Sequence, residues 1–146
     1  MPIANPEDFK ALEPFLRIIE HGLDGLADGD DFFDMLAEDV VFDYIITVPD
    51  YPRRVEGRRA VAELYRSYGE SLFLDRCYDL AVHHDAGTGV VVLEYASEGY
   101  VVATGAPYRN HYISVLTIHD RKVTGWRDYL DPIAVFDAVG WPTDRG

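Results

Sequence analysis

The chain has little cysteine, few basic residues and no long apolar run. Cys77 is the only cysteine among 146 residues, so neither an intrachain disulfide nor a cysteine-based metal site can form. The 13 basic residues are outnumbered by 26 acidic ones, and the formal net charge of -13 disfavours nucleic acid and anionic membrane surfaces as partners. No stretch approaches the roughly 18 uninterrupted apolar residues of a membrane-spanning helix. We therefore expect neither nucleic-acid nor membrane partners.

The composition provides enough apolar material for one core. The residues are 48% hydrophobic and 13% aromatic, and the length is typical of one domain, which we place at 1–146. The N-terminus lacks the basic and apolar segments of a secretory signal, and the lone cysteine fits a reducing compartment, so we expect a cytoplasmic protein. No phosphate-binding loop or dinucleotide fingerprint is present, and adjacent His83 and His84 would point to opposite faces of a strand. We expect no cofactor and no metal.

Helical signals are concentrated in the first half of the chain. Residues 5–7 (Asn-Pro-Glu) combine an N-cap, a proline at the first helical position and an acid in the first turn. Apolar residues at spacings of three and four then predict a helix that ends near Gly22 or Gly25. A second, short helix is predicted over 30–36, and a third over 57–68.

Strand signals dominate the second half. After one strand at 40–48 and a loop at 49–56, turn residues separate four predicted strands, at 72–84, 90–102, 108–119 and 122–130. A helical turn at 133–139 closes the chain. Helices first and an antiparallel meander after them predict an α+β fold, with helices on one face of a curved sheet.

The last predicted strand carries the main candidate for an acid/base group. Strand side chains alternate between faces, so Trp126, Asp128 and Leu130 share one face. Burial beside Trp126 and Leu130 would disfavour the charged form of Asp128 and raise its pKa toward the range useful for proton transfer.

The partner of Asp128 on the preceding strand depends on the length of the connecting loop. A three-residue loop places Tyr112 opposite Asp128 and Asn110 opposite Leu130. A two-residue loop would instead place Ile113 opposite Asp128. We adopt the three-residue loop, in which Tyr112 can hydrogen-bond the carboxyl group and orient it.

Two segments resemble a known family. Residues 112–132, YISVLTIHDRKVTGWRDYLDP, resemble the closing hairpin of SnoaL-like proteins, which belong to the superfamily of nuclear transport factor 2 and ketosteroid isomerase. Residues 57–61, Gly-Arg-Arg-Ala-Val, resemble the start of a helix in the same proteins, and the order of elements matches. The resemblance implies a cone-shaped barrel, with a strongly curved mixed or antiparallel sheet and N-terminal helices that enclose a pocket. It also implies a homodimer formed through the outer face of the sheet.

The resemblance also implies roles for particular residues. An acid at the position of Asp128 acts as a base in proteins similar to limonene epoxide hydrolase, and transfers protons in polyketide cyclases and phenazine-biosynthesis relatives. Ketosteroid isomerase carries its catalytic aspartate near the end of the first strand, which makes Asp43 the second-ranked acid. Epoxide hydrolases support their base with an arginine and a second aspartate. Tyr95 and Ser97 occupy those places here, so the resemblance does not extend to that arrangement.

The expected function is cofactor-independent proton transfer on a small, largely apolar molecule, with Asp128 as the reacting group. Isomerisation, cyclisation, dehydration and hydrolysis all remain open. The side chains expected to bind the substrate are Tyr44, Tyr95, Asn110, Tyr112, Trp126 and Leu130. Two alternatives remain: a non-catalytic protein that binds a small molecule in the same pocket, and a scaffold that binds another protein.

Overall fold

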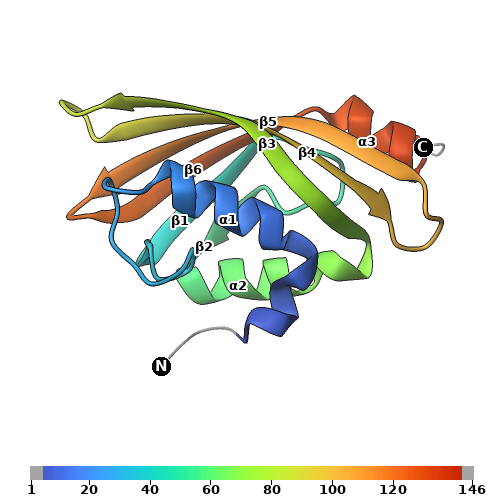
Figure 1. The fold of residues 1–146 in the computed structure, drawn as a ribbon, viewed down its shortest axis with the longest axis horizontal. Coiled ribbons are helices and arrows are strands. Elements are labelled where there is room, and N and C mark those ends of the chain that lie inside the picture. Colours follow the sequence, from blue (N-terminus) through green and yellow to red (C-terminus); the bar gives the residue numbers. More distant parts are fainter. Residues whose placement is uncertain (1–4, 143–146) are drawn as a thin grey trace.

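The computed structural model describes residues 5–142, in which one curved sheet holds two helices against its concave face (Figure 1). The strands are β1 (Leu36–Ile46), β2 (Arg54–Glu56), β3 (Leu72–Asp85), β4 (Val90–Val101), β5 (Pro107–His119) and β6 (Lys122–Leu130). The helices are α1 (Glu13–Gly22), α2 (Arg58–Arg66) and α3 (Pro132–Val139), with 3-10 segments η1 (Pro6–Leu12) and η2 (Tyr68–Glu70).

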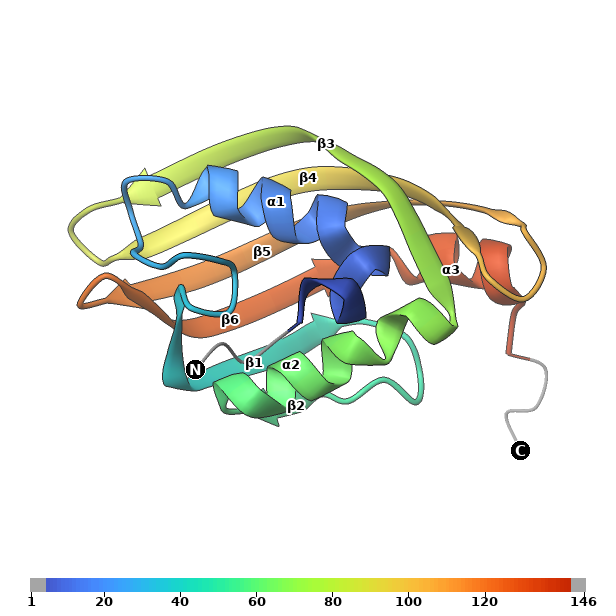
Figure 2. The same ribbon diagram turned by 60° about the horizontal axis from the view of Figure 1, so that its bottom comes forward.

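The sheet is six-stranded, in the order β2-β1-β6-β5-β4-β3. Strand β1 runs parallel to β6, and every other neighbouring pair is antiparallel. The predicted α+β class with a curved mixed sheet is confirmed. The sheet does not close into a full barrel, because β2 and β3 remain as edges and α1 and α2 cover the concave face between them (Figure 2).

The long edge strand β3 gives the sheet much of its curvature. Its pairing with β4 shifts register twice, and Asp79 between Tyr78 and Ala81 has a φ of 58°. Near the other shift the two backbones approach so closely that a Cβ on Gly99 would lie 2.0 Å from the carbonyl oxygen of Phe73. Only glycine permits this approach, which lets β3 and β4 bend toward the helices.

The predicted start of the first helix is confirmed, because Asn5 Oδ1 accepts a hydrogen bond from the Glu7 amide at 3.1 Å. The helix is not continuous, since its first part is the 3-10 segment η1, which is kinked at Phe9, and α1 begins only at Glu13. The predicted helix over 30–36 is wrong. The carboxylate of Asp31 accepts a hydrogen bond from the Asp34 amide, which stabilises a turn there, and β1 already begins at Leu36 to pair with β6.

The predicted loop over 49–56 contains a short strand. Its last three residues form β2, which pairs with β1 and ends directly before Gly57, the N-cap of α2. The remaining strands lie within a few residues of their predicted positions.

The predicted register between β5 and β6 is also wrong. Residues 120–121 both have positive φ values, of 51° and 65°, so the strands are joined by a tight two-residue turn. A bulge at Thr124 then shifts the pairing by one further residue. Ser114 therefore lies opposite Asp128, where the two predicted registers place Tyr112 or Ile113.

Aromatic side chains pack between the sheet and the helices. The indole of Trp126 stacks on Phe42 with ring centroids 4.8 Å apart and an interplanar angle of 11°. Phe32 and Phe15 meet the same indole edge-on, at 5.8 and 6.2 Å. Trp126 is 1% exposed, so this cluster forms a rigid base beneath the neighbouring residue Asp128.

Candidate active site

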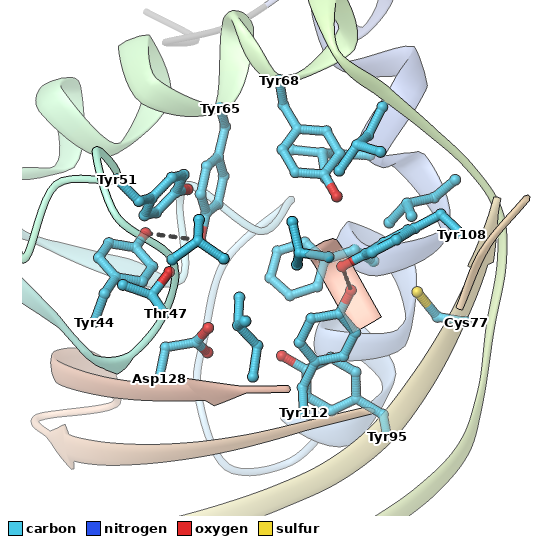
Figure 3. A pocket seen from close by; sticks show the side chains of 17 residues that line it. Tyr44, Thr47, Tyr51, Tyr65, Tyr68, Cys77, Tyr95, Tyr108, Tyr112 and Asp128 are labelled. Atoms are coloured by element: carbon cyan, nitrogen blue, oxygen red, sulfur yellow. Dashed lines mark hydrogen bonds between the residues drawn. The ribbon is translucent and has the colours of Figure 1, made fainter. Parts of the chain in front are cut away.

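A cavity of about 130 Å³ lies between the helices and the concave face of the sheet (Figure 3). Most of its wall is aliphatic or aromatic. Its tyrosines are Tyr44, Tyr51, Tyr65, Tyr68, Tyr95, Tyr108 and Tyr112, out of ten in the chain. The other polar lining residues are Thr47, Cys77 and Asp128, and no described lining residue is Lys, Arg or His. The cavity is thus an apolar space with many hydroxyl groups and one acid.

The carboxyl group of Asp128 is held from one side only. Its Oδ1 accepts hydrogen bonds from Ser114 Oγ at 2.8 Å and from Trp126 Nε1 at 2.9 Å. No donor within the described residues bonds Oδ2, and the carboxyl group points into the cavity (Figure 3). Oδ1 therefore fixes the orientation, and Oδ2 is left for a bound molecule.

The surroundings shift the pKa of Asp128 upward. Burial is the largest influence and raises the pKa above the ordinary carboxyl value, whereas the hydrogen bonds from Trp126 and Ser114 lower it. None of the described lining residues is a cation that would favour the charged form of Asp128. A carboxylate with a raised pKa is a stronger base once it is ionised, which suits proton transfer.

A hydrogen-bond chain supports the carboxyl group from behind. Ser114, which is fully buried, donates its only hydroxyl hydrogen to Asp128 and lies 2.7 Å from the hydroxyl of Tyr95. Tyr95 must therefore donate to Ser114. Because all three side chains stand on neighbouring strands, the sheet itself fixes the direction in which Asp128 points.

The tyrosine hydroxyls of the cavity are firmly protonated. Burial raises the pKa values of Tyr44, Tyr65, Tyr95 and Tyr112 well above that of free tyrosine. Protonated phenols can donate hydrogen bonds to a ligand oxygen. Tyr44 and Tyr95 already donate to Tyr65 and Ser114, but Tyr65 keeps its own hydrogen for a ligand oxygen. The wall can thus stabilise negative charge without any cationic residue among its described lining.

One end of the cavity uses its hydroxyls internally. The hydroxyls of Tyr108 and Tyr112 lie 3.0 Å apart, and Tyr112 also lies 2.8 Å from Ser97 Oγ. Asn110 donates to Tyr108 at 2.8 Å. Figure 3 shows Tyr108 and Tyr112 at the end of the cavity away from Tyr44.

The structure brings five of the eight site residues expected from the sequence into contact with the cavity: Tyr44, Tyr95, Tyr112, Asp128 and Leu130. Trp126 and Asn110 lie behind the wall instead. Trp126 donates to Asp128, and Asn110 bonds Tyr108 and the backbone of Asp131. Both support residues that line the cavity.

Asp43, the second-ranked acid, is not part of this site. Its neighbours Phe42 and Tyr44 are buried on the concave side of β1, so the alternation of the strand turns Asp43 to the other face. There it forms an ion pair with Arg54 at 3.3 Å. The sequence alone does not show which side chains of this strand face the cavity, and the burial of Phe42 and Tyr44 decides it.

Several residues of the site were missed from the sequence. Thr47 and Tyr51 lie in the loop after β1, where no periodicity indicates the direction of a side chain. Tyr65 lies on the buried face of α2, and helical periodicity alone does not tell a core side chain from one that lines a cavity. Ser114 was missed because the bulge in β6 shifts the pairing.

Two features are absent from residues 5–142. No group of three or more His, Cys, Asp or Glu side chains is arranged to hold a metal ion there. None of the helices in this range is both long and apolar enough to cross a membrane.

Two curated proteins are similar to the chain over most of its length. The protein YesE of Bacillus subtilis, uncharacterised, is 32% identical over 103 residues, which are 70% of each chain. The PhzA/B-like protein PA3332 of Pseudomonas aeruginosa, also uncharacterised, is 26% identical over 125 residues, covering 86% of this chain and 84% of its own.

Solved structures share the fold. An isomerase candidate from Bacillus subtilis has a TM-score of 0.72 and 27% identity, with 96% of both chains covered. A polyketide cyclase candidate from Pseudomonas putida has a TM-score of 0.65 and 17% identity, covering 90% of this chain and 97% of that chain. An epoxide hydrolase from M. tuberculosis, similar to limonene epoxide hydrolase, has a TM-score of 0.56 and 20% identity, covering 90% and 84%.

The family model described as a SnoaL-like domain matches residues 19–126. The match begins within α1, covers α2 and most of the sheet, and ends two residues before Asp128. The case for Asp128 therefore depends on its geometry. By this match, which spans more than half of its length, the chain belongs to the SnoaL-like domain family.

Proposed function

We propose that the chain is a cofactor-independent acid/base enzyme that moves a proton on a small, largely apolar molecule, with Asp128 as the proton-transfer group. The observation that carries this proposal is the arrangement of one carboxyl group. Ser114 and Trp126 hold Oδ1, while Oδ2 faces an apolar cavity with no cation among its described lining residues. Such a group is oriented, has a raised pKa and retains a free oxygen for the substrate.

The chemistry that fits this arrangement begins with a carbon acid. Ionised Asp128 removes a proton from a carbon next to a carbonyl group, and the electron pair moves onto the carbonyl oxygen. Hydroxyl donors in the wall stabilise the resulting enolate. The carboxylic acid then returns the same proton to another carbon, which completes an isomerisation without any other reactant.

Epoxide hydrolysis fits the residues less well. That reaction requires a group that protonates the epoxide oxygen in addition to the base that activates water. Tyr95 and Ser97 hold the places of the supporting arginine and aspartate. The hydroxyl of Tyr95 bonds Ser114, and that of Ser97 bonds Tyr112. We therefore favour proton transfer on a carbonyl compound.

The test uses 3-cyclohexen-1-one, a six-membered ketone whose isomerisation to the conjugated ketone raises ultraviolet absorbance. Asp128→Asn should lower kcat/KM by about 10²–10⁴-fold, because the base is lost while the shape is kept. The matched control is Asp43→Asn, which removes the other candidate acid and should leave the rate unchanged. Equal rates for wild type and Asp128→Asn would rule out Asp128 as the base.

A second candidate function is non-catalytic binding of a small amine. The observation that favours it is the carboxylate without a cationic partner among aromatic rings, since both features attract a cation. Calorimetric titration with trimethylamine tests this candidate. Binding that Asp128→Asn weakens more than tenfold, in a protein that does not isomerise the ketone, would select this function over the enzyme.

We also propose that two copies of the chain pair through the outer face of the sheet. Ile113, Tyr129 and Ile46 lie side by side across β5, β6 and β1 on that face, and the two isoleucines are 43% and 48% exposed. An exposed apolar row of this kind suits an interface. Light scattering after size-exclusion chromatography should give the mass of a dimer at micromolar concentration, and a monomer would contradict the proposal.

A further inference from the structure

Thr47 is an unusual residue in the wall of the cavity. Its side chain is 8% exposed, and its Oγ1 has no hydrogen-bond partner in the structure. Of all buried side-chain nitrogen and oxygen atoms within residues 5–142, this is the single one without a partner. Buried hydroxyls are almost always paired, because an unpaired one loses its bonds to water without replacement.

The neighbouring polar groups bond one another and not Thr47. The Tyr44 hydroxyl donates to that of Tyr65, at 3.4 Å. Asp128 Oδ1 accepts its hydrogen bonds from Ser114 and Trp126. The Thr47 hydroxyl is therefore available to a molecule inside the cavity.

Thr47 stands at the same end of the cavity as the proposed base. Tyr44 pairs with Asp128 across β1 and β6, and Thr47 follows three residues later, directly after β1 ends. Figure 3 shows Thr47 close to Tyr44 and Asp128, away from the bonded pair Tyr108 and Tyr112. One ligand can therefore meet both the hydroxyl and the carboxylate.

The size and charge of the cavity limit what this ligand can be. A volume of about 130 Å³ is below the roughly 300–1,000 Å³ of pockets for drug-sized molecules. It is close to the roughly 150 Å³ of an engineered protein cavity that binds benzene. The one charged lining residue within the described range is Asp128, which repels anions. A neutral six-membered ring meets these limits.

We propose that Thr47 determines the specificity of the site, by donating a hydrogen bond from its hydroxyl to the carbonyl oxygen of a small, neutral cyclic ketone. The proposal rests on the proposed function, because the carbonyl group acidifies the carbon from which Asp128 would take a proton. It adds the class of the substrate and the residue that selects it. Thr47 binds the oxygen, and the apolar wall holds the ring.

The test compares two ligands that differ in one group. Cyclohexanone carries the carbonyl oxygen, and methylenecyclohexane has a CH₂ group in its place with nearly the same shape. Dissociation constants are measured from NMR chemical-shift changes for the wild type, Thr47→Val and Thr47→Ser. Valine keeps the shape of threonine without the hydroxyl, and serine keeps the hydroxyl.

The expected result is specific to the oxygen. Thr47→Val should weaken cyclohexanone binding about tenfold and leave methylenecyclohexane binding unchanged, whereas Thr47→Ser should bind both as the wild type does. Equal weakening of both ligands by Thr47→Val would show a change of shape and overturn the proposal. So would unchanged binding of cyclohexanone, or a wild-type chain that binds neither ligand saturably.

Two further measurements keep the result interpretable. Thr47→Val should raise the melting temperature without ligand by about 2–4 °C, since it removes an unpaired buried hydroxyl. A lower melting temperature would mean that the hydroxyl is paired within the protein, which overturns the proposal. Asp128→Asn should still bind cyclohexanone. Loss of isomerisation in that variant tests the base, and loss of ketone selectivity in Thr47→Val tests the recognition residue.

Discussion

The two polar positions at one end of the cavity are built in different ways. Asp128 stands on the central strand β6, where Ser114 and Trp126 hold one of its oxygens. Thr47 stands in the loop after β1, and no described residue pairs with its hydroxyl. A group that transfers protons gains from a fixed direction, whereas a group that selects a ligand must keep its hydrogen bond free for that ligand. The strand therefore supplies orientation, and the loop supplies recognition.

The largest effect should come from removing the indole donor on the strand side. Trp126→Phe loses the hydrogen bond to Asp128 and leaves part of the indole volume unfilled against Phe42. We expect the free energy of unfolding to fall by about 3 kcal/mol, measured by urea denaturation.

The chain provides a matched control for this substitution. Trp141, the other tryptophan, is 54% exposed and donates to Asp137 at 3.1 Å. Trp141→Phe should change the free energy of unfolding by less than about 0.5 kcal/mol. Similar losses for both variants would contradict the view that the indole of Trp126 is part of a rigid support for Asp128.

The next two substitutions should change the free energy of unfolding in opposite directions, one on a strand and one in the loop after β1. Ser114→Ala removes a donor to the Asp128 carboxyl group and should lower the free energy of unfolding by about 2 kcal/mol. Thr47→Val also removes one hydroxyl but breaks no hydrogen bond, so it should raise the stability. Urea denaturation of both variants measures the difference. Losses of the same size at both positions would remove the distinction between them.

The same distinction explains what could be predicted from the sequence. The direction of Asp128 followed from the strict alternation of a strand, and the structure places it in the wall of the cavity beside Leu130. Its partner Ser114 could not be predicted, because the register depends on a bulge at Thr124 that no local pattern indicates. Thr47 lies in a loop, where the direction of a side chain depends on tertiary contacts alone.

The pH dependence should test how the strand side controls the pKa of Asp128. Since the base must be ionised, kcat/KM for the ketone should rise with pH through the pKa of Asp128, which burial raises above the ordinary carboxyl value. The hydrogen bond from Ser114 lowers this pKa, so Ser114→Ala should move the rise to higher pH. Thr47→Val should leave the profile where it is. A shift in the opposite direction would contradict the assigned role of Ser114.

The free energy of unfolding should depend on pH through the same pKa of Asp128. A raised pKa means that the folded chain binds the Asp128 proton more tightly than the unfolded chain does. The free energy of unfolding of the wild type, measured relative to Asp128→Asn, should therefore fall as the pH rises through the unfolded pKa to the folded one, and stay constant above it. A relative stability that rises over this range would contradict the direction of the shift.

The smallest effect should come from Tyr95, one step further from the carboxyl group. Its hydroxyl donates to Ser114, which keeps its own bond to Asp128 when that donor is removed. Tyr95→Phe should therefore lower the free energy of unfolding by about 1 kcal/mol and shift the pH profile less than Ser114→Ala does. Tyr100→Phe, at a tyrosine that is 37% exposed, is the matched control and should change the free energy of unfolding by less than about 0.5 kcal/mol. If Tyr95→Phe shifts the profile as far as Ser114→Ala, the tyrosine acts on Asp128 as strongly as its direct partner, and the support extends across β4, β5 and β6.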